Sequence, residues 1–160
     1  MGKSATFYVS IVVLCMTVLS SAADAQWRGP QRDGVYPGEE LLDVWPVGGP
    51  KLLWVADSIG EGFSSVAVTD TRVYVTGMVD GKGHLFAYNH QGSQIWKSEY
   101  GTEWTKNYPG SRTTPVVVGN RIYFVSALGI VHCFDTRGKE IWTVDVAQPY
   151  KAKAVSWGLV

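Results

Sequence analysis

The sequence predicts an all-β protein built from repeated four-stranded units, and three observations support this. Two stretches of the chain are similar at an offset of 46 to 49 residues. Each copy consists of short runs of β-branched and aromatic residues separated by Gly, Asn and Asp. No segment shows an apolar stripe at helical spacing. Four-stranded units that repeat every 45 or so residues are typical of the blades of a β-propeller.

Composition and charge limit the classes of function. The 160 residues include 14 basic and 14 acidic side chains, so the formal net charge is zero. This balance argues against a nucleic-acid partner, because such proteins present a basic surface to the phosphates. Apolar residues make up 46% of the chain and charged residues 18%, which indicates a folded domain.

The first element, residues 1–25, is predicted to be a secretory signal peptide. Lys3 provides a positive start, residues 7–19 form an apolar run, and Ala23-Asp24-Ala25 is a cleavage site that would leave Gln26 as the new N-terminus. We therefore expect a periplasmic or extracellular protein with no membrane span after cleavage.

Two alternatives to a signal peptide fit the sequence less well. A membrane anchor would need about 20 apolar residues, and the run is shorter. Cys15 suggests lipid attachment, but Leu14 occupies the position before it, where a small residue is expected.

The next elements are an N-terminal extended segment, residues 26–50, and an incomplete β-propeller, residues 51–160, holding about two blades plus edges. Residues 50–54 resemble the last strand of an earlier copy, and residues 157–160 lie about where a third copy would open. Propellers have at least four blades. We therefore expect the chain to be the N-terminal piece of a longer protein.

The two copies align in two parts. Residues 64–75 match 113–124, and residues 84–96 match the stretch that ends at 142. The offset falls from 49 to 46 because one hairpin is shorter in the second copy. A change of length confined to a turn is what a shared β framework predicts.

Each copy closes on a tryptophan that follows a glycine turn. Trp96 follows Gly92, Trp142 follows Gly138, and Trp54 occupies the corresponding place before the first copy. A large flat ring at this position would pack between neighbouring blades and bury much apolar area. We expect these five residues to be structural and the rings of Trp96 and Trp142 to be mostly buried.

Cysteine and histidine give no sign of a metal site. After cleavage the chain keeps only Cys133, in an alternating stretch where a small core residue is expected. No CxxC, HExxH or CxxCH spacing occurs, and His84, His90 and His132 share no spacing. We expect none of them to be a metal ligand.

Several motifs indicate a family. Residues 135–142, DTRGKEIW, resemble the tryptophan-docking repeat of quinoprotein-like propellers, and residues 89–96 are a looser copy. Residues 27–36, 45–54 and 108–115 are similar to the opening of secreted bacterial PQQ-binding-like propellers. The sequence thus resembles the quinoprotein alcohol dehydrogenase-like superfamily over nearly all of the mature chain.

The resemblance implies two classes of function. The superfamily includes dehydrogenases that use PQQ and calcium to oxidise alcohols or polyols, with calcium polarising the quinone carbonyl. It also includes an outer-membrane assembly lipoprotein with no enzymatic role. The enzymes typically carry an adjacent cysteine pair, and this sequence has none. We favour a non-catalytic scaffold that binds an exported protein or a small ligand at its channel mouth.

The candidate ligand-binding residues lie on loops that precede the inner strands. Loops 60–65 and 109–114 correspond at the 49-residue offset and should meet at one mouth of the channel. The Arg112 guanidinium could bind a carboxylate such as those of PQQ, or instead be tied to Glu61, Glu103 or a backbone carbonyl. Glu61 could supply a calcium ligand, although one carboxylate is not a site.

A third loop, residues 100–108, is rich in polar and aromatic side chains and lies between the two copies. We expect it to face a ligand or a partner.

Overall fold

The structure is a computed structural model that describes residues 25, 27–29, 31–36 and 42–159. The predicted signal peptide lies outside these residues except for Ala25. All regular elements in the described ranges are β-strands. A search of the described residues for a helix able to span a membrane finds none.

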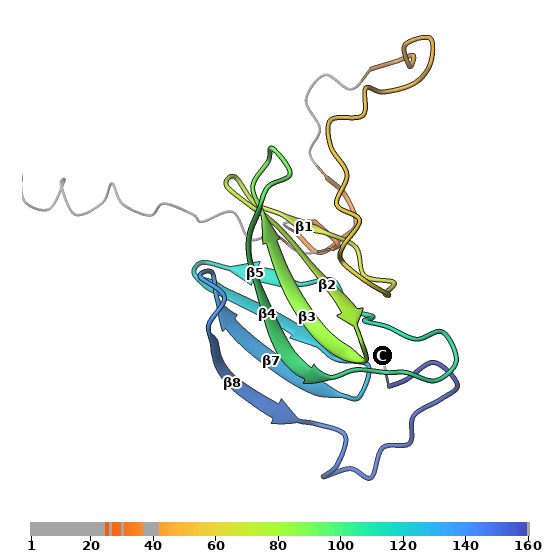
Figure 1. Cartoon of the computed structure of the whole chain (residues 1–160), viewed down its shortest axis with the longest axis vertical. Helices are drawn as coiled ribbons and strands as arrows, with labels where there is room; N and C mark the ends of the chain where they lie inside the picture. The colour runs from red at the N-terminus through yellow and green to blue at the C-terminus, as the bar shows by residue number, and fades with distance from the viewer. Residues whose placement is uncertain (1–24, 26, 30, 37–41, 160) are drawn as a thin grey trace, which may run out of the picture.

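Eight strands form two antiparallel sheets of four, each in the order of the chain. The first sheet contains β1 (Ala67–Val68), β2 (Val73–Val79), β3 (Lys82–Tyr88) and β4 (Gln94–Thr102). The second contains β5 (Val116–Val118), β6 (Arg121–Val125), β7 (Ile130–Asp135) and β8 (Glu140–Asp145). The two sheets stack face to face (Figure 1), as neighbouring propeller blades do. The prediction of four-stranded blades is confirmed.

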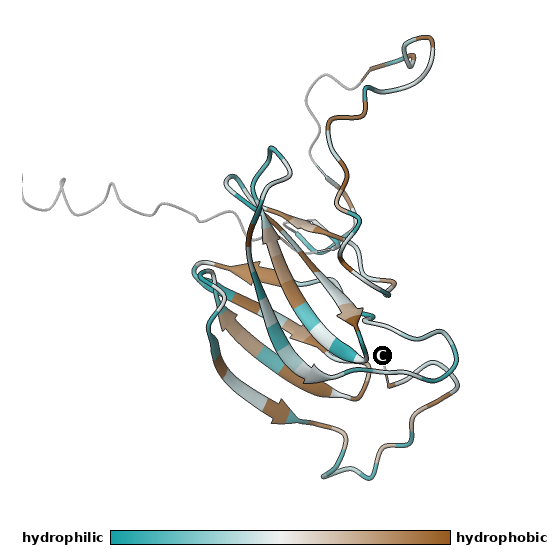
Figure 2. Cartoon of the chain, in the orientation of Figure 1, coloured by the Kyte–Doolittle hydropathy of each residue, from teal (hydrophilic) through white to brown (hydrophobic). Residues whose placement is uncertain are grey.

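The main hydrophobic core lies between the two blades. It joins one face of the first blade to the facing side of the second, through the buried residues Ala67, Tyr74, Leu85, Ala87, Tyr100, Val117, Ile122, Phe124 and Phe134. Figure 2 shows hydrophobic colour concentrated on the strands and hydrophilic colour on the turns between them. Burial of this apolar surface is what holds one blade against the next.

The first blade is covered on both faces. A second cluster of Val73, Val75, Phe86 and Tyr88 lies on its other side, under the segment that contains Trp54, Ala56 and Ile59. Because both faces are covered, six consecutive residues of β2 are buried, whereas all six residues of β8 are exposed. Successive side chains of a strand point to opposite faces, so uninterrupted burial requires a neighbour on each side.

The second hairpin is shorter, as expected, but the expectation that the change is confined to the turn is wrong. The strands themselves differ, because β2 and β3 have 7 residues each whereas β6 and β7 have 5 and 6. The expected strand at residues 50–54 is not observed, and residues 51–58 belong to no strand. A strand needs a hydrogen-bonded neighbour, and no described residue pairs with this segment.

Trp54 nevertheless packs on the first blade. Its indole N–H donates to the carbonyl of His90 at 2.9 Å, and its ring stacks on Tyr88 with centroids 6.2 Å apart. The ring lies directly on Gly92, where a Cβ atom would come within 2.7 Å of Trp54 Cγ. Only glycine leaves room for this contact, and Gly92 also has a φ of +83°, a conformation that glycine adopts without strain.

Trp96 repeats this contact with the second blade. Its indole N–H donates to the carbonyl of Thr136 at 3.2 Å, and its ring lies on Gly138. No glycine turn among the described residues packs against Trp142, and 42% of its surface is exposed. The expectation that the Trp142 ring is mostly buried is therefore wrong for this chain.

Candidate functional site

The two loops that the sequence aligned lie side by side at one end of the inner strands. Gly62 and Ser111 form a parallel bridge, and the N–H of Phe63 donates to the carbonyl of Ser111 at 2.8 Å. The N–H of Ser65 donates to the hydroxyl of Thr114 at 3.0 Å. Positions that correspond in the repeat thus become direct neighbours.

Half-buried hydroxyl groups fix both loops to their own blades in the same way. Ser64 Oγ donates to the carbonyl of Thr76 at 3.0 Å, and Thr113 Oγ1 donates to the carbonyl of Val125 at 2.6 Å. Thr76 Oγ1 in turn donates to the carbonyl of Thr113 at 3.0 Å, which links the blades. These supporting hydrogen bonds hold the loops of a binding surface in place before a ligand binds.

A cavity of about 420 Å³ opens between the loops, and we call it the mouth cavity. Its lining consists of Trp27, Phe63, Ser65, Arg112, Thr113 and Thr114. Two aromatic rings, three hydroxyl groups and one guanidinium therefore surround it. Sequence reasoning found Arg112 and the loop that contains Phe63 but assigned no role to Trp27, because nothing local places residue 27 beside residue 112.

Arg112 is held by backbone carbonyls. Its Nε donates to the carbonyl of Trp157 at 2.9 Å, and its guanidinium also donates to the carbonyl of Tyr108. The guanidinium carbon lies 4.7 Å from the centroid of the Phe63 ring, in a cation–π contact. The carbonyl of Trp157 reaches this place because the chain after β8 turns back, and Leu159 N–H donates to the carbonyl of Ala127 at 2.9 Å.

The alternative of an ion pair between Arg112 and Glu61 or Glu103 is wrong. Glu103 is buried, and its carboxylate accepts hydrogen bonds from Tyr100 Oη at 2.8 Å, Trp104 N at 2.9 Å and Ala127 N at 3.0 Å. A carboxylate with three donors needs no cation to be satisfied. Burial, followed by the charge of Glu103, raises the pKa of the Tyr100 hydroxyl far above its usual range, so this group stays a donor.

Glu61 contributes to the site through its backbone. Its N–H and C=O both pair with Met78 at 2.8 Å, which fixes loop 60–65 to β2. Its side chain is exposed and no ion pair joins it to Arg112 among the described residues. Of the three predicted ligand-binding residues, only Arg112 lines the mouth cavity.

The loop at residues 100–108 has three buried side chains in its first part, whereas residues 105–108 are exposed. Tyr100 and Trp104 are buried around Glu103, and Trp104 Nε1 donates to the carbonyl of Asn107 at 2.9 Å. Tyr108 is the aromatic residue of this loop that faces solvent, with 65% of its surface exposed. The expectation of an outward-facing loop holds for its last part only.

The described residues do not fit a PQQ and calcium site. PQQ carries several carboxylates, and the mouth cavity offers one cation, which two carbonyls already engage. Calcium takes six to eight oxygen ligands. Among the described residues no group of three or more His, Cys, Asp or Glu side chains gathers at any point.

The cysteine and the histidines have structural contacts. Cys133 is buried, which raises the pKa of its thiol. His84 contacts the carbonyl of Lys82 at 2.9 Å, His90 that of Thr69 at 2.8 Å, and His132 Nδ1 lies 3.0 Å from Glu140 Oε1. The ring of His132 packs on that of Phe124.

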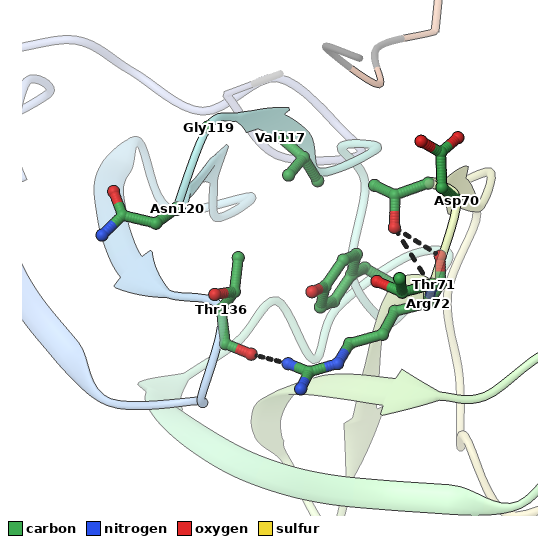
Figure 3. A pocket seen from close by; sticks show the side chains of 9 residues that line it. Asp70, Thr71, Arg72, Val117, Gly119, Asn120 and Thr136 are labelled. Atoms are coloured by element: carbon green, nitrogen blue, oxygen red, sulfur yellow. Dashed lines mark hydrogen bonds between the residues drawn. The ribbon is translucent and has the colours of Figure 1, made fainter. Parts of the chain in front are cut away.

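A second cavity, of about 300 Å³, lies at the opposite rim between the blades. Figure 3 shows Arg72 extending from the first blade to the carbonyl of Thr136 in the second. Trp96 Nε1 donates to the same carbonyl. Asp70, Thr71 and Asn120 also line this cavity, which the sequence did not indicate. Two donors on one carbonyl make this rim a polar seam that joins the blades.

The sheets, the glycine turns and the channel-mouth loops define two neighbouring blades of a tryptophan-docking propeller. Residues 47–159 match the profile of a PQQ-repeat family described as outer membrane protein assembly factor BamB. The chain belongs to this family, as the resemblance implied. A comparison with curated proteins finds no significant match.

Proposed function

We propose that this protein is an exported, non-catalytic scaffold that binds a segment of another exported protein at the mouth cavity. The observation that carries the proposal is the exposure of two aromatic residues beside Arg112, Phe63 at 60% and Tyr108 at 65%. Tryptophan, tyrosine and arginine are the residues that most often dominate the energy of protein–protein contacts.

The mouth is also suited to a polypeptide by its rigidity and polarity. The loops are fixed by backbone bridges and half-buried hydroxyl groups, so little conformational entropy would be lost on binding. Ser65 and Thr114 offer hydroxyl groups beside the aromatic rings. A surface that combines rigid aromatic rings with adaptable polar groups fits an extended segment with alternating side chains.

Family membership supports a scaffold role. The family is that of an outer membrane protein assembly factor, which supports a role with other exported proteins. The predicted signal peptide would bring the chain to the same compartment. We therefore propose that the protein acts in the periplasm or outside the cell, with an exported protein as its partner.

The test is site-specific photo-crosslinking in cells that export the protein. A photoreactive amino acid replaces Phe63 at the mouth or Lys139 on the opposite rim, and adducts are identified by mass spectrometry. A discrete adduct should form from position 63 and not from 139. It should weaken about tenfold with Arg112→Ala and stay unchanged with Arg137→Ala, whose side chain is 87% exposed at the far rim.

A quinone-dependent enzyme would give a different result. PQQ with calcium, titrated into the full protein while tryptophan fluorescence is followed, should produce no saturable quenching. Saturable quenching that Arg112→Ala abolishes, together with oxidation of an alcohol, would replace the scaffold with a dehydrogenase. Equal adducts from positions 63 and 139 would reject the mouth as the binding surface.

A further inference from the structure

The inner edge of the second blade is already paired with Ala25. Ala25 pairs with Val117 in an antiparallel bridge, with Ala25 N–H donating to the Val117 carbonyl at 3.0 Å and Val117 N–H donating to the Ala25 carbonyl at 2.7 Å. The sheet order places β5 at the edge, so its outer side has no strand of its own blade. Residue 25 occupies that side.

The geometry of β5 explains why this edge is open. Val118 and Arg121 flank a two-residue turn, and Val117 faces Ile122. Pairs in such a hairpin alternate between hydrogen-bonded and non-hydrogen-bonded, and the pair nearest the turn is hydrogen-bonded. Val117 is therefore in a non-hydrogen-bonded pair, and its N–H and C=O point away from β6 toward Ala25.

The bridge also covers apolar surface. Val117 is 3% exposed, and Ala25 packs against the core cluster that contains it. Val68 has the equivalent position in the first blade, 49 residues earlier, and is 54% exposed with no bridge on its outer side among the described residues. The equivalent residues Val117 and Val68 thus differ, because among the described residues only Val117 has a bridge on its outer side.

A residue close to Ala25 in the sequence lies at the mouth cavity. Trp27, two residues after Ala25, lines the cavity together with Arg112 and Phe63. Its carbonyl accepts a hydrogen bond from the hydroxyl of Tyr36, which holds the segment in place. One short stretch therefore supplies both a backbone pair at the strand edge and an aromatic side chain at the site.

We infer that the inner edge of β5 and the mouth cavity form one strand-addition site for an extended segment, with a small residue opposite Val117 and an aromatic residue two positions later. Ala25 and Trp27 are an intramolecular stand-in for that segment. The inference rests on the proposed function and specifies how the partner binds. When a peptide strand adds to a sheet edge, the main-chain hydrogen bonds provide affinity, and the pocket selects the side chains of the bound segment.

Signal-peptide cleavage would open the site. The sequence predicts a cut after Ala25, which would remove the residue that pairs with Val117 and leave the outward N–H and C=O of Val117 unpaired. An unpaired strand edge readily accepts another strand. The exported protein would then present the edge, whereas the uncut chain fills it.

The probe for the test is a labelled synthetic peptide with the sequence of residues 23–33. The host is the full chain carrying Ala25→Pro and Trp27→Ala, which weaken its own segment. Fluorescence anisotropy should show saturable binding of the peptide to this host and at least about tenfold weaker binding to the parent chain, whose site is filled. Replacing the tryptophan of the peptide by alanine should weaken binding about tenfold.

The backbone pair is tested by removing one donor at a time. Val117→Pro in the host removes the outward N–H while keeping the ladder to β6, and should weaken peptide binding about tenfold. Val68→Pro is the matched control in the other blade and should leave binding within about twofold. Because Val117→Pro could unfold the host, an N-methyl group on the Ala25 nitrogen of the peptide gives the same test, with methylation of its last residue as control.

Equal affinity of the methylated and unmethylated peptides, or no binding to the emptied host, would overturn the strand-addition site. Crosslinking from position 63 in the Val117→Pro protein separates the two proposals. If the partner still crosslinks there while the peptide does not bind, the mouth binds its partner without strand addition, and only the inference fails. If crosslinking fails in the parent protein as well, the proposed function fails.

Discussion

Trp96 and Trp142 hold the same position in successive blades and have different surroundings. Within its own blade each contacts the equivalent tyrosine, with ring centroids 5.9 Å apart for Tyr74 and Trp96 and 6.1 Å for Tyr123 and Trp142. Only Trp96 also meets the glycine turn of a following blade, at Gly138. The burial of this tryptophan is therefore decided by the next repeat and not by its own.

The turn that receives the tryptophan is also a repeated structure. Asn89 Oδ1 accepts hydrogen bonds from the backbone N–H groups of Gln91 at 3.0 Å and Ser93 at 2.8 Å. In the second blade, Asp135 Oδ1 accepts them from the N–H groups of Arg137 and Lys139, both at 2.9 Å. In both turns the side-chain oxygen fixes the loop around a glycine with positive φ. Each blade thus provides a tryptophan on one side and a receptor for one on the other.

The largest expected effect is a difference between the two tryptophans. Trp96→Ala should cost about 3–5 kcal/mol of unfolding free energy, because it removes a ring packed between blades. Trp142→Ala should cost about 1 kcal/mol, because a half-exposed ring buries less area. Urea denaturation of both variants measures this. Equal losses would show that Trp142 is buried in solution by a surface outside the described residues.

The second prediction concerns the turn that receives Trp96. A Cβ atom at Gly138 would lie 2.8 Å from Trp96 Cδ2, and its φ is +88°, so Gly138→Ala should cost about 3 kcal/mol from overpacking and backbone strain together. Gly119 has a φ of +55° with open space around it, so Gly119→Ala should cost only about 1 kcal/mol of strain. Thermal or urea unfolding measures both, and similar losses would contradict the docking contact.

The third prediction concerns Phe63 and Arg112, which correspond in the two copies and meet at the mouth. A double-mutant cycle of Phe63→Leu and Arg112→Ala should give a coupling energy of about 0.5–1 kcal/mol, as expected for an exposed cation–π pair. A cycle of Phe63→Leu with Arg137→Ala serves as a distant control and should give no coupling. Coupling in neither cycle would mean that the two loops do not hold these side chains together.

The smallest effect is expected at the turn residues themselves. The backbone N–H of Lys139 foremost, and that of Arg137, hold the pKa of the Asp135 carboxyl below its usual value of 3.8. A carboxyl with a lowered folded-state pKa adds stability above its unfolded pKa and loses it as the pH falls through the folded pKa. Asp135→Asn, which copies Asn89, should change stability at neutral pH by no more than about 0.5 kcal/mol.

The same variant should lose less stability than the parent between about pH 4 and pH 2, because it has no carboxyl to protonate at this turn. Urea titrations at several pH values measure this, and Asn89→Asp should shift the first blade in the opposite direction. Identical acid dependence of the parent and Asp135→Asn would show that the turn contacts do not favour the ionised carboxylate.

Much of the fold follows from local pattern, because strands, turns and the repeat are encoded within a few residues of one another. Alternating β-branched residues specify β2 and β6, and Asx and glycine specify the turns at residues 89–92 and 135–138. The site was predicted in part. The matched loops and Arg112 were found, but the role of Glu103 was not, because its burial depends on Ala127 from the other blade.

The sequence alone determined the four-stranded repeat, its length, its glycine turns and the family, since these depend on side-chain type and spacing along the chain. Tertiary structure decided which tryptophan is covered, that Arg112 binds carbonyls instead of a carboxylate, and that Ala25 and Trp27 lie at β5 and the mouth cavity. The contacts Trp96–Thr136, Arg112–Trp157 and Ala25–Val117 join residues 40, 45 and 92 positions apart in the chain. Their partners are fixed only when the blades pack, because no local propensity acts over such a separation.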